Sequence, residues 1–163
     1  MIERTLVIIK PDGVERCLSG RILARFEDAG LKIVGLKMVH VDKVVAMKHY
    51  TEDLAKRRGV HVRKMMVDFI SSGPVVVAVL EGVGAVEVVR KMTGDTEPRA
   101  AAPGTIRGDF SHVSYKYADS RKAPVKNIIH ASSSVEDAKA EVALWFGKDE
   151  VFSYRSVHDV HVL

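Results

Sequence analysis

The last third of this 163-residue chain places three reactive side chains close together: His130, Ser132 and Glu141. His130 follows the apolar pair Ile128-Ile129, which predicts a short buried strand ending at a serine-rich turn. Glu141 falls on or beside the apolar stripe of the helix predicted after that turn, and an inward carboxylate is costly unless a partner satisfies it. A carboxylate bonded to one imidazole nitrogen would fix the tautomer and leave the other nitrogen free as a nucleophile.

The helix after the turn has its own start signal. Ser133 and Glu136 have the capping-box spacing, in which each side chain bonds a free backbone N–H of the first turn. The apolar residues that follow recur at helical spacing: Val135, Ala138, Val142, Trp145 and Phe146. The spacing alone also fits a simpler interpretation, in which His130 ends a strand and Glu141 is a solvated helix residue.

Cations elsewhere in the chain suit phosphoryl chemistry. Lys10 ends the first predicted strand, Arg90 lies in the helix before a long loop, and Arg107 lies within that loop. Transition states of phosphoryl transfer spread negative charge over oxygens that fixed cations can stabilise. Arginine is well suited because its planar fork holds two oxygens at once. Each cation taken alone also fits a solvated surface charge.

Other nucleotide and metal motifs are absent or incomplete. Gly82-Val83-Gly84 follows a predicted strand, but Glu87 stands where a dinucleotide-binding loop needs its third glycine. No G-x-x-x-x-G-K-[ST] loop occurs, so side chains must hold any phosphates. His158 and His161 have no cysteine or tight acidic cluster beside them, which favours ordinary tail histidines over a metal site. The other histidines besides His130 also lack ligand-like neighbours: His40, His49, His61 and His112.

Hydrophobic periodicity predicts the elements that position these residues. Apolar runs predict buried strands at 5–9, 31–41, 74–80 and 128–129. Helical spacing predicts further helices, one capped by Ser19 and ended by Gly30, one capped by Asp42 and running to Leu54, and others over 62–70 and 85–92. A turn is predicted at 11–13, a long functional loop at 95–126 and an aperiodic tail at 147–163. This order is compatible with an α+β fold, a four-stranded sheet with helices on one face.

Composition sets limits on the class of protein. The chain is 47% hydrophobic and 28% charged, as in ordinary globular proteins, and its net charge of +4 suits polyanionic partners. A single cysteine, Cys17, excludes an intramolecular disulfide and agrees with a reducing compartment. The predicted strands lack the stacking aromatics of an RNA-binding sheet, which argues against nucleic acid as a partner. With no signal peptide and no membrane-length apolar run, we expect one domain over 1–163, no membrane partner and a cytoplasmic location.

The segment from Asn127 to Glu136, with Glu141 and Trp145-Phe146 after it, resembles the active-site segment of the nucleoside diphosphate kinases. The similar segments run through nearly the whole chain: 9–14, 72–75, 103–110, 127–146 and 154–162. The resemblance implies the ferredoxin-like version of the α+β fold. Its antiparallel four-stranded sheet would be covered by helices, with an inserted helical pair and a long active-site loop.

The resemblance implies an activity. His130 would take the γ-phosphoryl group of ATP and pass it to another nucleoside diphosphate, in a ping-pong reaction through a phosphohistidine. Glu141 and Ser132 would orient the imidazole, and Lys10 would complete the catalytic set. The partner expected besides nucleotides is a second copy of the chain, in a hexamer or sometimes a tetramer. The alternative is a catalytically weak nucleotide- or nucleic-acid-binding module on the same fold.

The resemblance also implies a set of nucleotide-binding residues: Lys10, Tyr50, Val62, Arg90, Thr96, Arg107 and Asn127. Lys10 would contact the γ-phosphate and the ribose 3′-hydroxyl, which Asn127 would also hold. Arg90 and Thr96 would meet the β-phosphate, Arg107 the transferring group, and Tyr50 the phosphate region. The expected cofactor is Mg²⁺, held by phosphate oxygens with few or no direct protein ligands.

This chain departs from the family pattern at several places. Ala131 stands where glycine is usual, and Ser133 where the family has aspartate. The aromatic that normally clamps the base is missing, so His61 or Val62 must substitute or the clamp is weaker. Residues 114–126 look like an insertion, and the apolar residue on the other side of the base is expected to be Val113 or Val125.

Overall fold

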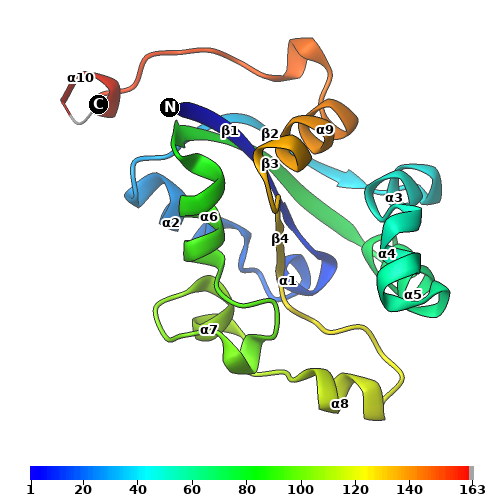
Figure 1. The fold of residues 1–163 in the computed structure, drawn as a ribbon. Helices are drawn as coiled ribbons and strands as arrows, with labels where there is room; N and C mark the ends of the chain where they lie inside the picture. The colour runs from blue at the N-terminus through cyan, green and yellow to red at the C-terminus, as the bar shows by residue number, and fades with distance from the viewer. Residues whose placement is uncertain (162–163) are drawn as a thin grey trace.

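The computed structural model describes residues 1–161 (Figure 1). Its elements in chain order are β1 (Ile2–Ile9), α1 (Pro11–Glu15), α2 (Ser19–Asp28), β2 (Lys32–His40), α3 (Lys43–His49), α4 (Glu52–Arg58), α5 (Val60–Ile70), β3 (Pro74–Val83), α6 (Ala85–Thr93), η1 (Pro98–Ala100), α7 (Ile106–Phe110), α8 (Tyr115–Ser120), β4 (Ile129–Ala131), α9 (Val135–Trp145), η2 (Lys148–Glu150) and α10 (His158–His161).

The strands form a four-stranded sheet in the order β2-β3-β1-β4. Each neighbouring pair is antiparallel, which confirms the α+β prediction and its four-stranded antiparallel sheet. Residues 6–9 of β1 are 0% exposed, as expected of a central strand covered on both sides. The short edge strand β4 pairs with β1 and places His130 opposite Ile8.

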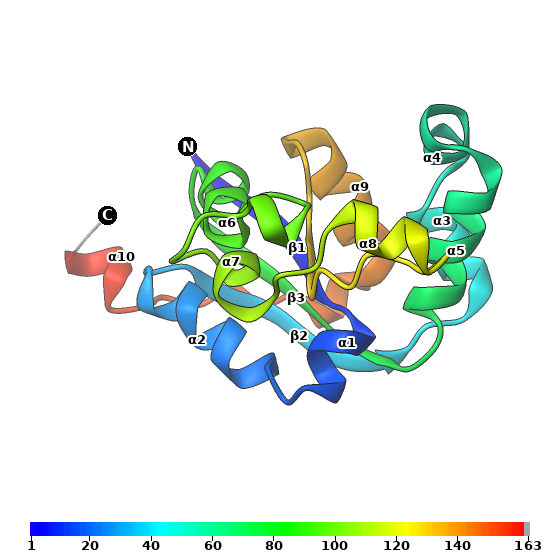
Figure 2. The same ribbon diagram turned by 90° about the horizontal axis from the view of Figure 1, so that it is seen from below.

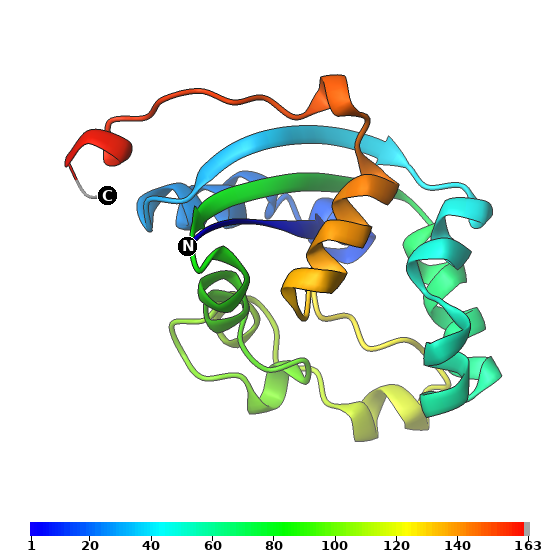
Figure 3. The same cartoon turned by 45° about the horizontal axis from the view of Figure 1, so that its top comes forward.

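Helices cover both faces of this sheet, not one face as the sequence predicted (Figures 1 and 3). Since side chains alternate along a strand, Val7 and Ile9 pack with α2, α6 and α7 on one face. Leu6 and Ile8 pack with α3, α5 and α9 on the other. Each large side chain buried in these two clusters contributes about 1.5–3 kcal/mol relative to an exposed one.

The predicted helix from Asp42 to Leu54 is two helices. Asp42 does cap α3, since its Oδ1 accepts from the Val45 N–H at 2.8 Å. The backbone of Tyr50 then leaves the helical region, with ψ at 84°, and α4 begins after Thr51. Acidic residues in the first turn of α4 and basic residues in its last turn complement the helix dipole. The inserted segment between β2 and β3 therefore holds α3, α4 and α5, rather than a helical pair.

Other predictions of local structure also need correction. Ser19 is the first residue of α2, and the N-cap is Leu18 with no side-chain bond. The predicted turn at 11–13 is the short helix α1, where proline is favourable because its missing N–H would be unpaired in the first turn anyway. The predicted loop at 95–126 contains η1, α7 and α8, and the tail contains η2 and α10. These helices are too short to produce a helical period in the sequence.

Candidate active site

His130 lies in the middle of β4 and lines the large cavity of the molecule. Its Nε2 lies 2.9 Å from Glu141 Oε1 and 3.0 Å from Oε2. A carboxylate can only accept, so Nε2 carries the hydrogen and donates it to Glu141. His130 Nδ1 then holds the free lone pair, and it makes no hydrogen bond within residues 1–161. This arrangement leaves one nitrogen of the imidazole ready to act as a nucleophile.

Glu141 is in turn held by Ser132, whose hydroxyl donates to Glu141 Oε2 at 2.6 Å. Ser132 is fully buried, and its oxygen accepts from the backbone N–H of Leu6 at 3.2 Å. Burial alone would raise the pKa of Glu141, but hydrogen bonding and charge interaction with His130 hold that pKa below its ordinary value. The inward glutamate predicted from the sequence is therefore a charged group with two partners.

Helix α9 begins one residue later than the predicted capping box. Ser134 is the N-cap, and its hydroxyl accepts from the Asp137 N–H at 3.0 Å. Ser133 bonds the Asp137 side chain instead of capping the helix, and Glu136 lies exposed in the first turn. The helix stripe still places Glu141 and Trp145 on the sheet side, because the shift of the cap does not change the spacing inside α9.

His49 is part of this site, although in the sequence its lack of ligand-like neighbours argued against a metal-ligand role. Its side chain is 1% exposed, and its ring stands edge-on to the His130 ring with centroids 4.5 Å apart. His49 Nδ1 accepts from the Trp145 indole N–H at 3.4 Å and lies 3.7 Å from Glu141 Oε1. Burial, supported by the nearby His130 ring, lowers the pKa of His49 to about 3. The one feature of the sequence that pointed to a role for His49 in the site was its position beside Tyr50, a predicted nucleotide-binding residue.

Together, His49, His130 and Glu141 are close enough for metal coordination, with candidate ligand atoms within 4.8 Å of one another. The Glu141 oxygens, His130 Nε2 and His49 Nδ1 already have partners. Both oxygens of Glu141 contact His130 Nε2, and the Trp145 N–H points at His49 Nδ1. We therefore assign this cluster to holding the imidazole of His130 and not to a resident metal.

On the other side of the cavity, Lys10 is buried and its Nζ donates to Asn127 Oδ1 at 2.7 Å. Asn127 Nδ2 donates in turn to the Thr96 carbonyl at 2.9 Å. Burial, followed by the nearby charge of Arg107, lowers the pKa of Lys10 to about 8. The three residues predicted from distant parts of the chain, Lys10, Thr96 and Asn127, are thus joined by hydrogen bonds.

Asp12 is a site-supporting residue for which we predicted only a turn. Its side chain is buried, and its Oδ2 accepts from the Ile128 N–H at 3.0 Å. Burial raises the pKa of Asp12, while Lys10 and backbone N–H groups act in the opposite direction. Ile128 has φ at 72°, a strained value for a β-branched residue. The Asp12 bond is one of the contacts that hold this strained step just before His130.

Arg107 is buried and donates mostly to backbone carbonyls. Its Nη2 donates to Ile129 O at 2.7 Å, its Nη1 to Gly94 O at 2.7 Å, and its Nε to Asn127 O at 3.3 Å. Burial lowers the pKa of Arg107 to about 10. Gly108 lets α7 pack closely against the backbone at Ala102, since a Cβ at position 108 would meet Ala102 O at 2.1 Å. Arg107 therefore fixes the position of β4 as well as adding positive charge.

The cavity has a volume of about 780 Å³. It brings together nine of the ten predicted site residues: Lys10, Tyr50, Val62, Arg90, Thr96, Arg107, Asn127, His130 and Glu141. The tenth, Ser132, lies buried beneath the wall and reaches the cavity through Glu141. Tyr50 contributes a buried hydroxyl without a partner in the described residues, and burial raises the pKa of that phenol.

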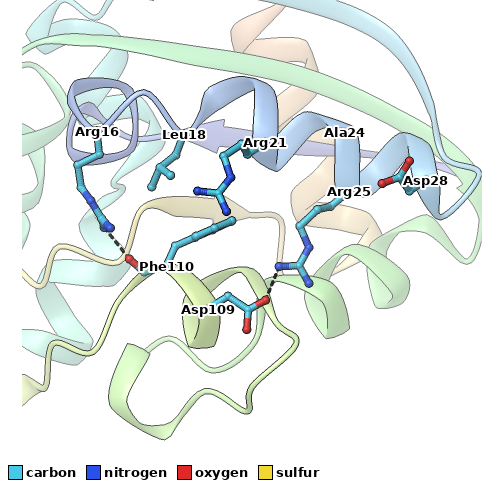
Figure 4. A pocket seen from close by; sticks show the side chains of 8 residues that line it. All are labelled: Arg16, Leu18, Arg21, Ala24, Arg25, Asp28, Asp109 and Phe110. Atoms are coloured by element: carbon cyan, nitrogen blue, oxygen red, sulfur yellow. Dashed lines mark hydrogen bonds and ion pairs between the residues drawn. The ribbon is translucent and has the colours of Figure 1, made fainter.

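A second hollow, of about 660 Å³, lies between α2 and α7 (Figure 4). Arg21 stacks on the ring of Phe110, with 4.6 Å between the guanidinium carbon and the ring centroid. Arg16 donates to the Phe110 carbonyl and Arg25 pairs with Asp109. Its lining contains none of the ten site residues predicted from the sequence.

Comparison with known proteins agrees with this geometry. The model of the family described as "Nucleoside diphosphate kinase" matches residues 3–151. A nucleoside diphosphate kinase of Pyrococcus horikoshii is 52% identical, over 96% of this chain and 93% of that protein. A nucleoside diphosphate kinase of Borreliella burgdorferi is 46% identical, over 95% of this chain and 93% of that protein.

Solved structures are also similar to this chain. One is described as a transition state mimic of nucleoside-diphosphate kinase from Borrelia burgdorferi with bound vanadate and ADP. It superposes with a TM-score of 0.95 at 45% identity and covers 98% of this chain and 96% of that chain. An NDP kinase from Pyrobaculum aerophilum gives a TM-score of 0.85 at 36% identity, over 94% of this chain and 100% of that chain.

Proposed function

The chain belongs to the nucleoside diphosphate kinase family and has that family's enzymatic activity, and from this premise we propose that His130 is the residue that carries the phosphoryl group. The observation that carries the proposal is the 2.9 Å contact between His130 Nε2 and Glu141, which engages Nε2 and leaves Nδ1 without a partner among the described residues. Nδ1 would attack the γ-phosphorus of ATP. The N–P bond forms as the bond to the leaving ADP oxygen breaks, and the reverse exchange passes the group to a second nucleoside diphosphate.

Glu141 and Ser132 would act by holding the ring. The imidazole gains positive charge when Nδ1 binds phosphorus, and the charged Glu141 next to Nε2 would stabilise that charge. Ser132 orients the carboxylate through the 2.6 Å bond. Both partners remain in place through the two half-reactions, so the same geometry would serve donor and acceptor nucleotides.

Lys10 and Asn127 would bind the sugar and the transferring phosphate. Their 2.7 Å bond places a cation and an amide side by side in the cavity wall. With a pKa of about 8, Lys10 is mostly protonated at neutral pH and can balance phosphate charge. Thr96, which orients the Asn127 amide, would contact the β-phosphate from the same wall.

Arg90, Arg107 and Tyr50 would complete the phosphate site. Burial is the main cause of the lowered pKa of Arg107 and the nearby charge of Arg90 a smaller one, which supports a shared anion-binding region for the two guanidinium groups. The buried hydroxyl of Tyr50 has no partner among the described residues and can donate to a phosphate oxygen. Val62, in the cavity wall on α5, would contact the nucleoside end.

The donor set fits Mg²⁺ held by the nucleotide. Lys10, Arg90 and Arg107 are cations, and the carboxylate nearest the proposed nucleophile, Glu141, is bonded to His130 and Ser132. When bound across the phosphates, Mg²⁺ neutralises part of their charge. These residues would therefore hold the Mg²⁺–nucleotide complex through its phosphate oxygens and sugar, without direct metal ligands.

The proposal also covers the domain organisation, the oligomeric state and the cellular location. We expect one domain over residues 1–163, a homo-oligomer of hexameric form and a cytoplasmic location. The edge strand β2 supports self-association, since Leu36 and Met38 are 52% and 61% exposed there. No helix in the part of the chain described here is long and apolar enough to cross a bilayer.

Labelling with γ-³²P-ATP tests the catalytic proposal. The protein should retain acid-labile, base-stable label, and a chase with GDP should move that label to GTP. His130→Ala should abolish labelling, whereas His112→Ala, at an exposed position, should label normally. Full labelling of the His130 variant would overturn the assignment. Strongly salt-dependent nucleic-acid binding without phosphate exchange would instead indicate the binding module.

A further inference from the structure

The α5 side of the cavity has no phenylalanine, tyrosine or tryptophan in its lining. The cavity residues of that wall are His61, Val62, Met65 and Met66. Phe69, the aromatic residue of α5, is buried and does not line the cavity. A nucleobase bound there would meet aliphatic and thioether groups and the small imidazole of His61, with no phenyl, phenol or indole ring to stack on.

The opposite wall supplies such a ring. Tyr115 opens α8, within the 114–126 segment, and lines the same cavity as His130 and Lys10. The Arg58 guanidinium carbon at the end of α4 lies 5.6 Å from the Tyr115 ring centroid, within cation–π range. Figures 2 and 3 show α8 beside the α4–α5 pair, so this contact joins the two sides of the cavity.

Hydrogen bonds hold the backbone at the start of α8, where Tyr115 lies. Its backbone N–H donates to Glu97 Oε1 at 2.8 Å, and the preceding residue, Ser114, caps α8 by accepting from the Tyr117 N–H at 3.1 Å. Ala118 is 3% exposed and packs α8 against the body of the protein. A ring that is already positioned loses little freedom on binding, which is what a stacking platform requires.

The Tyr115 ring also reaches toward the phosphate site. Burial is the main cause of the lowered pKa of Arg107, and the Tyr115 phenol acts in the opposite direction on that pKa. The phenol therefore lies within electrostatic range of Arg107, whose Nη2 bonds Ile129 O beside His130. A nucleotide whose phosphates reach His130 would pass close to Tyr115.

We propose that Tyr115 is the stacking partner of the nucleobase in this chain, with Arg58 backing its ring and Val62 and Val125 lining the remaining wall. This inference rests on the proposed function, because it assumes that the phosphates lie at His130. Stacking uses the π-face that every base has, so the platform accepts purines and pyrimidines alike. Tyr115 thereby takes the place of the aromatic that is missing near residues 58–62.

The test compares Tyr115→Ala and Tyr115→Phe with Tyr117→Ala, a matched control two residues away. Tyr117 is 59% exposed and does not line the cavity. Tyr115→Ala should raise the KM for ATP roughly 10-fold, in line with typical stacking contributions, while Tyr115→Phe and Tyr117→Ala stay near wild type. Inorganic tripolyphosphate, which has no base, should inhibit all four proteins with the same inhibition constant.

Each outcome has a separate meaning. An unchanged KM for ATP in Tyr115→Ala overturns the inference. An equal weakening of tripolyphosphate inhibition also overturns it, because the substitution would then have disturbed the phosphate site. If the wild-type protein transfers no phosphate through His130, the proposed function fails, a result that the Tyr115 variants cannot produce.

Discussion

The imidazole of His49 stands edge-on to that of His130, with an interplanar angle of 87° and centroids 4.5 Å apart. His49 also bonds Trp145 and approaches Glu141, so it occupies the space behind the proposed nucleophile. The neutral His49 ring separates His130 from the core, and it does not compete for the proton on His130 Nε2. The proposed nucleophile, His130, therefore has a carboxylate on one side and a second, uncharged histidine on the other.

Glu141→Gln should keep the shape of the site and remove its negative charge. A hydrogen bond to a charged group contributes about 1.5–3 kcal/mol, which predicts a fall in kcat of roughly 10- to 150-fold. Steady-state assays with ATP and GDP measure this fall. Glu136→Gln, exposed in the same helix, is the control and should stay within about twofold of wild type. Equal activity of the two variants would contradict the role given to Glu141.

His49 should make the protein less stable in acid. Its pKa is about 3 in the folded state and near the ordinary value of 6.5 when unfolded, so the unfolded chain binds the extra proton between these values. Stability from the neutral His49 is complete above pH 6.5 and is lost as the pH falls toward 3. Urea unfolding at pH 7 and 4.5 should show a smaller acid loss for His49→Gln than for wild type. A parallel loss in both proteins would contradict the buried, neutral state of His49.

Lys10 should give the enzyme an alkaline limit. Because its pKa is about 8, the ammonium that balances phosphate charge is lost as the pH rises through that value. The profile of kcat/KM between pH 6 and 10 should fall with an apparent pKa near 8 in the wild type. Lys10→Arg cannot titrate in this range, so any activity that it retains should show no such fall. An identical alkaline limb in both proteins would assign the ionisation to another group.

Gly108→Ala should displace α7 and, with it, the Arg107 side chain. The added Cβ would meet the Ala102 carbonyl oxygen at 2.1 Å, so α7 must move and the Arg107 bonds to Gly94 and Ile129 must lengthen. Overpacking of this kind costs about 1–3 kcal/mol of unfolding free energy. Gly20→Ala is the matched control, because a Cβ there meets nothing within 4 Å. Chemical denaturation of both variants, with kcat measured alongside, separates the two cases.

The sequence was sufficient for the residues whose roles follow from local spacing or from motifs. The strand at His130, the helix after it and the inward position of Glu141 are set by the 2.0 and 3.6 periods of strands and helices, although β4 covers Ile129–Ala131 rather than the predicted 128–129. The capping box was shifted by one residue, because several consecutive serines can each serve as an N-cap. The break between α3 and α4 was missed for a similar reason, since both helices contain apolar residues and no glycine or proline separates them.

Only the tertiary structure decided which distant groups meet. The β1–β4 pairing brings Lys10 within 2.7 Å of Asn127, 117 residues away, and the packing of α3 on α9 brings His49 to His130. Asp12, His49 and Tyr115 carry no local pattern that distinguishes them from ordinary turn or surface residues. Their roles arise from burial and from partners on other elements, and these are properties of the folded chain as a whole. Sequence periodicity specifies the face of an element on which a side chain lies, whereas the free energy of packing selects what that face contacts.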